Sequence, residues 1–258
     1  FSELGWYRFP VDPEIANWLR VAGPQALAMR HDPEMARDWL VCGDTWFVGV
    51  NALANDGDGV VGQSGPLTGQ VMDFIRNDLG FGNGKLDRAQ VSICYPGYPK
   101  PRQGETEAGF RFRRDRDAAH IDGLHPVGPD RRRKIEEFQG FLLGIPVTET
   151  NHLAAPLVVW EGSHRIMQAM FCEALADCPA TEWHQVDLTE AYNAARRQVF
   201  EDCPRRVVHA RPGESYVLNR FTLHGISPWQ EGAAAALEGR AILYFRPEIE
   251  RETWLLTG

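Results

Sequence analysis

The residues best suited to chemistry in this sequence are His120, Asp122 and His224. His120 and Asp122 are two positions apart, and in an extended strand such residues point to the same face. His224 comes much later, at the end of a β-rich run, and Gly225 follows it. Two imidazoles and one carboxylate on one face of an octahedron bind Fe(II) and leave the opposite face open. The spacing therefore predicts a metal site that the first two residues begin and His224 completes.

Short β-rich runs are the elements that would position these residues. Each run is bounded by Gly, Pro, Asn or Asp, which interrupt strands. Many short strands of this kind favour a barrel or jelly roll over a parallel α/β sheet. We therefore expect a mainly β fold, with strands over residues 45–50, 88–95, 118–122, 138–148, 156–160, 205–211, 215–224 and 240–246.

Helices are predicted before the strands and between them. Residues 12–14 and 32–34 both read Asp-Pro-Glu, a pattern in which aspartate caps a helix and proline occupies its first turn. The first helix is expected to end at Gly23-Pro24. Further helices are expected over residues 70–79, after a cap at Ser163, and after Asp187.

The chain of 258 residues shows no linker that would divide it. A chain of this length can bury a substantial core, and we expect one domain over residues 1–258. Residues 1–43 would form N-terminal helices that pack on the barrel.

Charge and composition restrict the classes of partner. The formal net charge of −8 argues against nucleic acid, which needs a dominant basic surface. No apolar run is long enough to span a membrane. The five cysteines are scattered and form no Cys-x-x-Cys pair, a pattern typical of reduced thiols in the cytoplasm. Small molecules are therefore the expected partners.

Residues 88–248 resemble the phytanoyl-CoA dioxygenase family of 2-oxoglutarate-dependent oxygenases. The resemblance rests on an ordered series of motifs. It begins with His120-Ile121-Asp122, continues with the Gly-Ser-His turn within residues 156–164 and with the Pro-Gly-Glu turn at residues 212–214, and ends with His224-Gly225 and Arg240.

This resemblance implies a double-stranded β-helix, a jelly-roll barrel of the cupin type, with inserted helices. It implies Fe(II) bound by His120, Asp122 and His224, and 2-oxoglutarate chelating that iron. Arg240 would bind the far carboxylate of 2-oxoglutarate through two parallel hydrogen bonds. Reaction with O₂ would hydroxylate a small or medium organic substrate and release succinate and CO₂. An aspartate as third ligand favours hydroxylation over halogenation.

The co-substrate contacts have several candidates. Arg246 is six residues after Arg240 on the same strand face and is its rival for the carboxylate. The family often has serine two places after the distal histidine, whereas this chain has Ile226 there and Ser227 one place later. Ser227 is therefore a candidate, and so, by position in an earlier strand, are Gln90, Ser92 and Tyr95.

Two basic segments flank the metal pair, at residues 111–116 and 131–134. Such segments are most often solvated loops. The alternative is a clamp for an anionic substrate, in which Arg111 and Arg113 alternate with Phe110 and Phe112 along a strand. We expect His125 to be a solvated loop histidine and His164 to brace a turn.

Two other functions stay open at this point. A cupin-like metal enzyme that does not use 2-oxoglutarate would have the same barrel, but Arg240 and Arg246 would then have no role. A catalytically inactive, ligand-binding barrel is the second alternative. The metal triad argues against it, because a carboxylate and two imidazoles gathered inside a barrel are costly without an ion.

Overall fold

The computed structural model describes residues 1–256 and has antiparallel sheets at its centre. The larger sheet contains β1 (Trp6–Phe9), β2 (Leu40–Val41), β3 (Trp46–Phe47), β4 (Gln90–Cys94), β7 (Phe141–Pro146), β10 (Ser215–Asn219) and β12 (Arg240–Phe245). Its strand order is β1-β10-β7-β12-β4-β3-β2. The smaller sheet contains β8 (Leu157–Trp160), β9 (Arg205–Val208) and β11 (His224–Ile226), with β8 in the middle. A separate hairpin pairs β5 (Leu124–Val127) with β6 (Arg132–Ile135).

The two main sheets face each other across a shared core. Along β12, alternate residues point to opposite sides, as the period of a strand requires. Leu243 and Phe245 pack into the cluster that includes Trp18, whereas Ile242 and Tyr244 pack into the cluster that includes residues of β8 and β9. The expected mainly β fold is thus confirmed at the level of antiparallel sheets that share a core. In residues 1–256 no hydrogen-bonded strand pair joins the two main sheets into a closed barrel.

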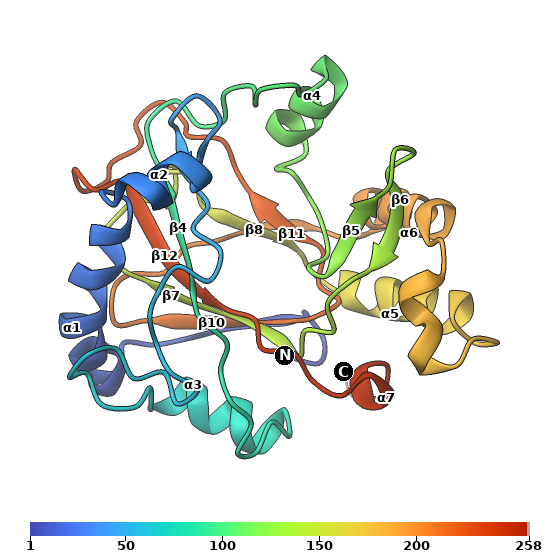
Figure 1. The fold of residues 1–258 in the computed structure, drawn as a ribbon, viewed down its shortest axis with the longest axis horizontal. Coiled ribbons are helices and arrows are strands. Elements are labelled where there is room, and N and C mark those ends of the chain that lie inside the picture. The colour runs from blue at the N-terminus through green and yellow to red at the C-terminus, as the bar shows by residue number, and fades with distance from the viewer. Residues whose placement is uncertain (257–258) are drawn as a thin grey trace.

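Helices make up 30% of the chain and lie around the sheets. They are α1 (Pro13–Met29), α2 (Pro33–Trp39), α3 (Gln70–Asp73), α4 (Glu107–Asp115), α5 (Ser163–Ala174), α6 (Thr189–Asp202) and α7 (Arg251–Trp254), with a π-helical turn at Phe74–Asp78 and a 3₁₀ helix at Ala180–Gln185. Helix α1 covers the outer side of the larger sheet, while α5 and α6 lie on the other side of the molecule beside the β5–β6 hairpin (Figure 1).

Several helix predictions are confirmed. The side chains of Asp12 and Asp32 accept hydrogen bonds from the backbone N–H groups of the first turns of α1 and α2. The helix expected over residues 70–79 is formed by α3 and the π-helical turn that follows it.

Other helix predictions are wrong for physical reasons. Helix α1 does not end at Gly23-Pro24 but runs to Met29, because residues on both sides of the proline are buried against the sheet. Ser163 does not cap α5; its Oγ accepts a hydrogen bond from the backbone N–H of Leu223 instead, at 2.9 Å.

The first basic segment is neither the solvated loop expected for it nor the strand of the alternative reading. Arg111 and Arg113 lie in α4, which begins where the Thr106 hydroxyl accepts a hydrogen bond from the Gly109 N–H. Residues 118–122 form an isolated bridge rather than a full strand. Strand β1 and the β5–β6 hairpin were not expected at all.

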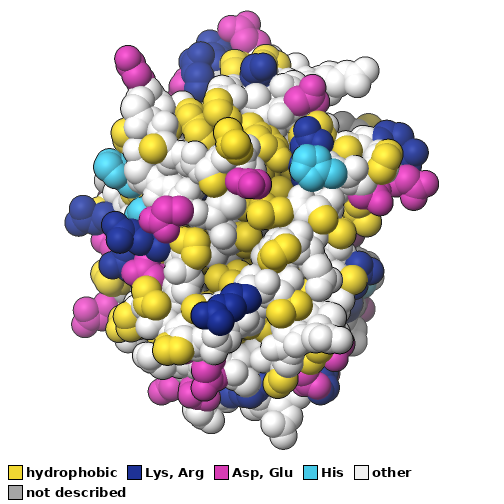
Figure 2. All heavy atoms as spheres, turned by 90° about the vertical axis from the view of Figure 1, so that its left-hand side faces the viewer, with side chains coloured by type: hydrophobic (Ala, Val, Ile, Leu, Met, Phe, Trp, Pro, Cys, Tyr) yellow, Lys and Arg dark blue, Asp and Glu magenta, His cyan; other side chains and the backbone are white. Residues whose placement is uncertain are grey.

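The surface carries charges of both signs. On the face shown in Figure 2, Lys and Arg lie among Asp and Glu, and hydrophobic side chains gather around a hollow. Within residues 1–256, none of the helices has the length and apolar character needed to cross a bilayer.

A matched pair of glycine substitutions tests the packing of this fold. A Cβ on Gly144 in β7 would lie 2.1 Å from the Tyr216 ring, whereas a Cβ on Gly23 in α1 would lie 3.4 Å from Val147. We expect Gly144→Ala to lower the free energy of unfolding by about 1–3 kcal/mol through overpacking. Gly23→Ala should leave it unchanged or raise it by up to about 1 kcal/mol. Urea denaturation measures both, and equal effects would contradict the packing described.

Candidate metal centre

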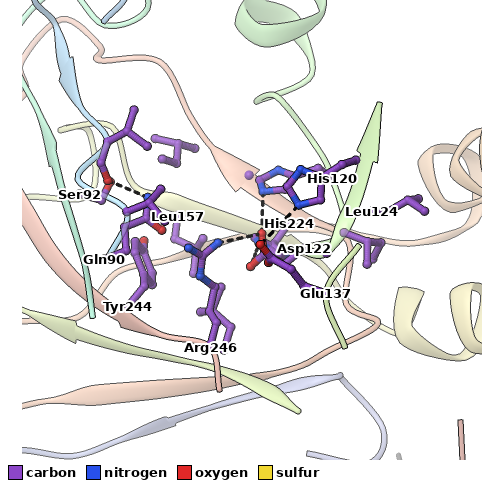
Figure 3. Close-up of a pocket in the computed structure, with 18 of the residues that line it drawn as sticks. Gln90, Ser92, His120, Asp122, Leu124, Glu137, Leu157, His224, Tyr244 and Arg246 are labelled. Atoms are coloured by element: carbon purple, nitrogen blue, oxygen red, sulfur yellow. Dashed lines mark hydrogen bonds and ion pairs between the residues drawn. The ribbon is translucent and has the colours of Figure 1, made fainter. Parts of the chain in front are cut away.

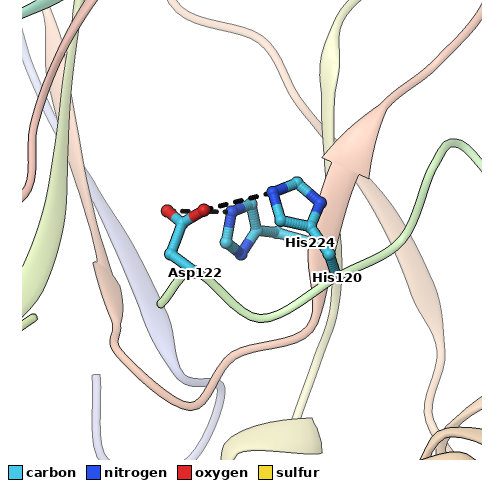
Figure 4. A group of neighbouring side chains, drawn as sticks. All are labelled: His120, Asp122 and His224. Atoms are coloured by element: carbon cyan, nitrogen blue, oxygen red, sulfur yellow. Dashed lines mark hydrogen bonds and ion pairs between the residues drawn. The ribbon is translucent and has the colours of Figure 1, made fainter. Parts of the chain in front are cut away.

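His120, Asp122 and His224 come together at one end of the smaller sheet (Figure 4). One ligand atom from each residue lies within 4.8 Å of the others. The His224 side chain is 7% exposed, whereas that of His120 is 47% exposed. The site therefore has an inner wall and an open side.

A reciprocal backbone pairing brings the two histidines together. The His120 N–H donates to the His224 carbonyl at 2.8 Å, and the His224 N–H donates to the His120 carbonyl at 3.1 Å. A Cβ on Gly225 would lie 2.1 Å from the Asp117 carbonyl oxygen. Glycine after His224 is therefore required, because the segment before His120 passes directly over it.

The hydrogen bonds of the imidazoles direct their Nε2 atoms into the site. His120 Nδ1 lies 2.9 Å from the Ala118 carbonyl, and His224 Nδ1 lies 2.9 Å from the Thr222 carbonyl. A carbonyl only accepts, so each Nδ1 carries a hydrogen, and each Nε2 is the atom that offers a lone pair to a metal when the imidazole is neutral. These Nε2 atoms lie 3.1 and 3.5 Å from the two Asp122 oxygens.

The charges around Asp122 keep it ionised. Its burial acts to raise the pKa of the carboxyl, but Arg246, His224 and His120 outweigh burial and hold the pKa well below its ordinary value. Arg246 Nη1 lies 3.5 Å from Asp122 Oδ1. For His224, burial acts to lower the pKa, but Asp122 outweighs it and raises the pKa.

The donor set fits a divalent cation. Asp122 Oδ2 is buried and accepts no hydrogen bond, although a buried carboxylate oxygen is normally satisfied. A metal ion would satisfy it and would use both Nε2 lone pairs. Two imidazoles and one carboxylate are the facial set that Fe(II) oxygenases use, with positions left open for other ligands.

The triad forms part of the wall of a cavity of about 370 Å³ between the two main sheets (Figure 3). Gln90 and Ser92 line it from β4, and Tyr244 and Arg246 from β12 and the residue after it. The Arg246 side chain points toward Asp122.

Arg240 lies in the same core with no anion beside it. It is 2% exposed, and its Nη2 donates to the Tyr244 hydroxyl at 3.1 Å. Its Nη1 is buried and has no hydrogen-bond partner. Among residues 1–256, no carboxylate forms an ion pair with this guanidinium at 4.0 Å or less. Because a buried charge is costly without a partner, this is an unusual position for an arginine.

The structure separates the candidate co-substrate residues into two groups. Gln90 lines the cavity, where its Nε2 donates to the Val48 carbonyl at 2.9 Å, and Arg246 lines it as well. Arg240 and Ser227 do not line the cavity. Arg240 is connected to it through Tyr244, and the Ser227 Oγ accepts a hydrogen bond from Arg205 at 3.2 Å. Tyr95 lines a different cavity, beside Arg30, so its position does not support the role expected for it.

Several residues of the cavity were missed or misplaced in the sequence analysis. Trp46, Val48 and Val50 all line it, and their spacing of two in a β-rich run is a signal that could have found them. His125 is exposed as expected, but it lies in strand β5 rather than in a loop, and it lines the cavity with Nε2 3.9 Å from a Glu137 oxygen.

No family model matches the sequence, and no curated protein matches it. Among solved structures, AviO1 from Streptomyces viridochromogenes Tue57 is similar, with 16% identity, 96% of this chain and 91% of that chain covered, and a TM-score of 0.46. The non-heme alpha ketoglutarate dependent carbocyclase SnoK from nogalamycin biosynthesis is similar at 12% identity, with 95% and 80% covered and a TM-score of 0.42. EctD from S. alaskensis, solved with 2-oxoglutarate and 5-hydroxyectoine, is similar at 16% identity, with 95% and 73% covered and a TM-score of 0.42. Values this low assign no activity to this chain.

Metal binding should be visible as a gain in thermal stability. With anaerobic Fe(II) at a hundred times its dissociation constant, the folded state should gain about 2.7 kcal/mol, which raises Tm by about 5–10 °C in a chain of this size. Asp122→Ala and His224→Ala should each abolish this gain. His31→Ala, which removes an exposed histidine, should keep it; a gain that persists in all three variants would contradict the site.

A second prediction concerns Asp87, which lines a neighbouring cavity that shares Arg246 with the metal pocket. Burial raises the pKa of Asp87 from 3.8 to about 6, although its Oδ1 accepts a hydrogen bond from the Arg246 N–H. Because the folded-state pKa is the higher one, the folded protein binds this proton more tightly than the unfolded chain. The resulting stabilisation is complete below about pH 4 and is lost as pH rises through about 6.

Asp87→Asn keeps a hydrogen-bond acceptor and removes the charge. It should raise the free energy of unfolding at pH 8 by about 1–2 kcal/mol relative to the native chain and leave it nearly unchanged at pH 4. Urea denaturation at the two pH values measures this, with the exposed Asp130→Asn as control. A variant that is less stable than the native chain at pH 8 would rule out the assignment.

Proposed function

We propose that the chain is an Fe(II)- and 2-oxoglutarate-dependent oxygenase, similar to the phytanoyl-CoA dioxygenase family and built as one domain on a double-stranded β-helix. It would hydroxylate a small or medium organic substrate and release succinate and CO₂. One observation carries the proposal. A facial metal-ligand set lines a cavity between two sheets, and Tyr244, which also lines it, accepts a hydrogen bond from the buried Arg240, whose Nη1 has no partner.

The triad would hold the iron through His120 Nε2, His224 Nε2 and an Asp122 oxygen. Bound iron, with 2-oxoglutarate and O₂ at its open positions, supplies the oxidising chemistry. The backbone carbonyls that accept from the two Nδ1–H groups fix the ring orientations before metal binds.

Arg240 would bind the far carboxylate of 2-oxoglutarate. The Tyr244 hydroxyl oxygen already accepts from Arg240 and from the Tyr216 hydroxyl, at 3.1 and 3.2 Å. Its own hydrogen is therefore free to donate to a ligand oxygen beside Arg240 Nη1. Arg246 is the weaker candidate, because its guanidinium already faces Asp122.

The cavity walls would hold the substrate and restrict water. Most lining groups near the triad are apolar, and the polar groups of β4 are already engaged: Ser92 Oγ accepts from the Trp46 indole at 3.0 Å, and Gln90 donates to Val48. The apolar lining includes Val48, Val50, Leu142, Leu157 and Ile226.

An anaerobic titration tests this function without knowledge of the substrate. Fe(II) and then 2-oxoglutarate are added to metal-free protein, and the visible charge-transfer band of the chelated keto acid is measured. His120→Ala should remove the band, because it removes a metal ligand. Arg240→Met should raise the 2-oxoglutarate concentration at half-saturation by about ten- to a hundred-fold, the value of a lost charge-assisted hydrogen bond.

Arg246→Met is the matched comparison on the same strand face. It should change the 2-oxoglutarate concentration at half-saturation less than Arg240→Met does. The reverse order would move the carboxylate site to Arg246. Bound iron with no band in the native chain would exclude the keto-acid mechanism and favour a cupin-like metal enzyme. No bound metal at all would favour a ligand-binding barrel without activity.

A further inference from the structure

Arg133 in β6 is a positive charge that lines the metal pocket without a counterion. The side chain is half-buried. Its Nη1 has one long hydrogen bond, 3.4 Å to the Leu124 carbonyl, and its guanidinium lies 5.8 Å from the Tyr192 ring centre. Within residues 1–256, no carboxylate lies within 4.0 Å of it. An arginine held this way has donors left for an anion that enters the pocket.

The surroundings of Arg133 are positive rather than negative. The Arg196 guanidinium lies 5.2 Å from the centre of the same Tyr192 ring and 4.7 Å from the centre of the Phe112 ring. Burial lowers the pKa of Arg133, and the charges of Arg196 and Arg131 lower it further. Two guanidinium groups near one phenol ring repel each other, and an anion beside Arg133 would reduce that repulsion.

The other charged groups of the pocket are already paired. Glu137 accepts a hydrogen bond from Gln139 at 2.6 Å and lies 3.9 Å from His125. Arg246 faces Asp122. Next to Arg133 in sequence, Arg132 pairs with Asp187 at 3.4 Å and does not line the pocket. Arg246 Nε also lacks a hydrogen-bond partner, but among the described residues that line the pocket Arg133 is the arginine with no carboxylate within 4.0 Å.

We propose that the pocket takes an amphipathic substrate whose carboxylate or phosphate group pairs with Arg133 while its apolar body lies along the cavity wall toward the triad. This inference rests on the proposed function and names the substrate class of the same site. A planar guanidinium can bind either anion through two parallel hydrogen bonds. The apolar body would contact Trp46, Val48, Val50, Leu124, Pro126 and Leu157.

The arrangement also fixes which part of the substrate is oxidised. Arg133 and the triad line the same cavity from different elements: Arg133 lies on β6, His224 on β11, and His120 and Asp122 on the segment before β5. The anionic group is thus an anchor, and the reacting carbon belongs to the apolar body. Only the second basic segment supplies this anchor; Arg111 and Arg113 of the first segment do not line the cavity.

Isothermal titration calorimetry with matched probes tests the inference. The probes are 4-phenylbutyrate, 4-phenylbutyl phosphate and 4-phenylbutanol, which share an apolar body and differ in the end group. They are titrated into the full chain with Fe(II) and 2-oxoglutarate under anaerobic conditions, so that no turnover occurs. At least one anion should bind about ten-fold or more tightly than the alcohol, the value of a charge-assisted pair.

Arg133→Met should bring the anions to within about two- to three-fold of the alcohol, because the pair is lost, and should leave the affinity for the alcohol unchanged. Arg133→Lys should restore part of the preference. Arg132→Met removes the same charge one residue away and should keep the full preference. A preference that survives in Arg133→Met, equal affinities in the native chain, or no binding of any probe would each overturn the inference.

Two further arms separate this inference from the proposed function. A preference that depends on Arg240 rather than Arg133 would mean that the probes occupy the co-substrate site, which overturns the inference. If the charge-transfer band is missing, the same titration is run without 2-oxoglutarate. An Arg133-dependent preference would then support the anion site while the oxygenase proposal fails.

Discussion

The backbone pairing between His120 and His224 is the contact on which the site depends. It joins segments that are distant in sequence and places both imidazoles on one side of β11. A bidentate ion pair braces the same segment, with Arg205 donating to both Asp117 oxygens at 2.7 and 2.8 Å. The Asp117 carbonyl in turn accepts from the Ile226 N–H at 2.9 Å. The ligand geometry is thus set by the fold itself, which is what a preorganised metal site requires.

Buried charge is the second constraint, and it follows from the alternation of β12. The strand presents Arg240 and Tyr244 to the space between the sheets, while Leu243 and Phe245 support α1 on the other side. Burying a guanidinium costs free energy, whereas burying an apolar side chain stabilises the fold. Packing alone would therefore favour an apolar residue at position 240. The inner face of β12 instead carries a buried guanidinium whose Nη1 has no hydrogen-bond partner.

The sequence predicted the grouping of His120, Asp122 and His224 better than the local structure that carries them. The three side chains do lie together, but His120 and Asp122 lie on a bridge and turn rather than on a strand. The β5–β6 hairpin was missed because Pro126 and the basic run resemble a loop. Helix α4 was missed because alternating Phe and Arg are compatible with both a strand and a helix. The cap at Thr106 favours the helix. The positions of Tyr95 and Ser227 depend on tertiary packing that no local pattern contains.

The β5–β6 hairpin forms a sheet of its own, with no strand pairing to either main sheet, although β5 begins two residues after Asp122. Changes of sequence or length in it leave the register of β8, β11 and β12 untouched, because no ladder transmits the shift. The His120–His224 pairing and the hairpin that bears Arg133 therefore belong to different hydrogen-bonded ladders around one pocket. In evolutionary terms, the far end of the hairpin can vary in sequence while the pairing that groups His120, Asp122 and His224 is kept.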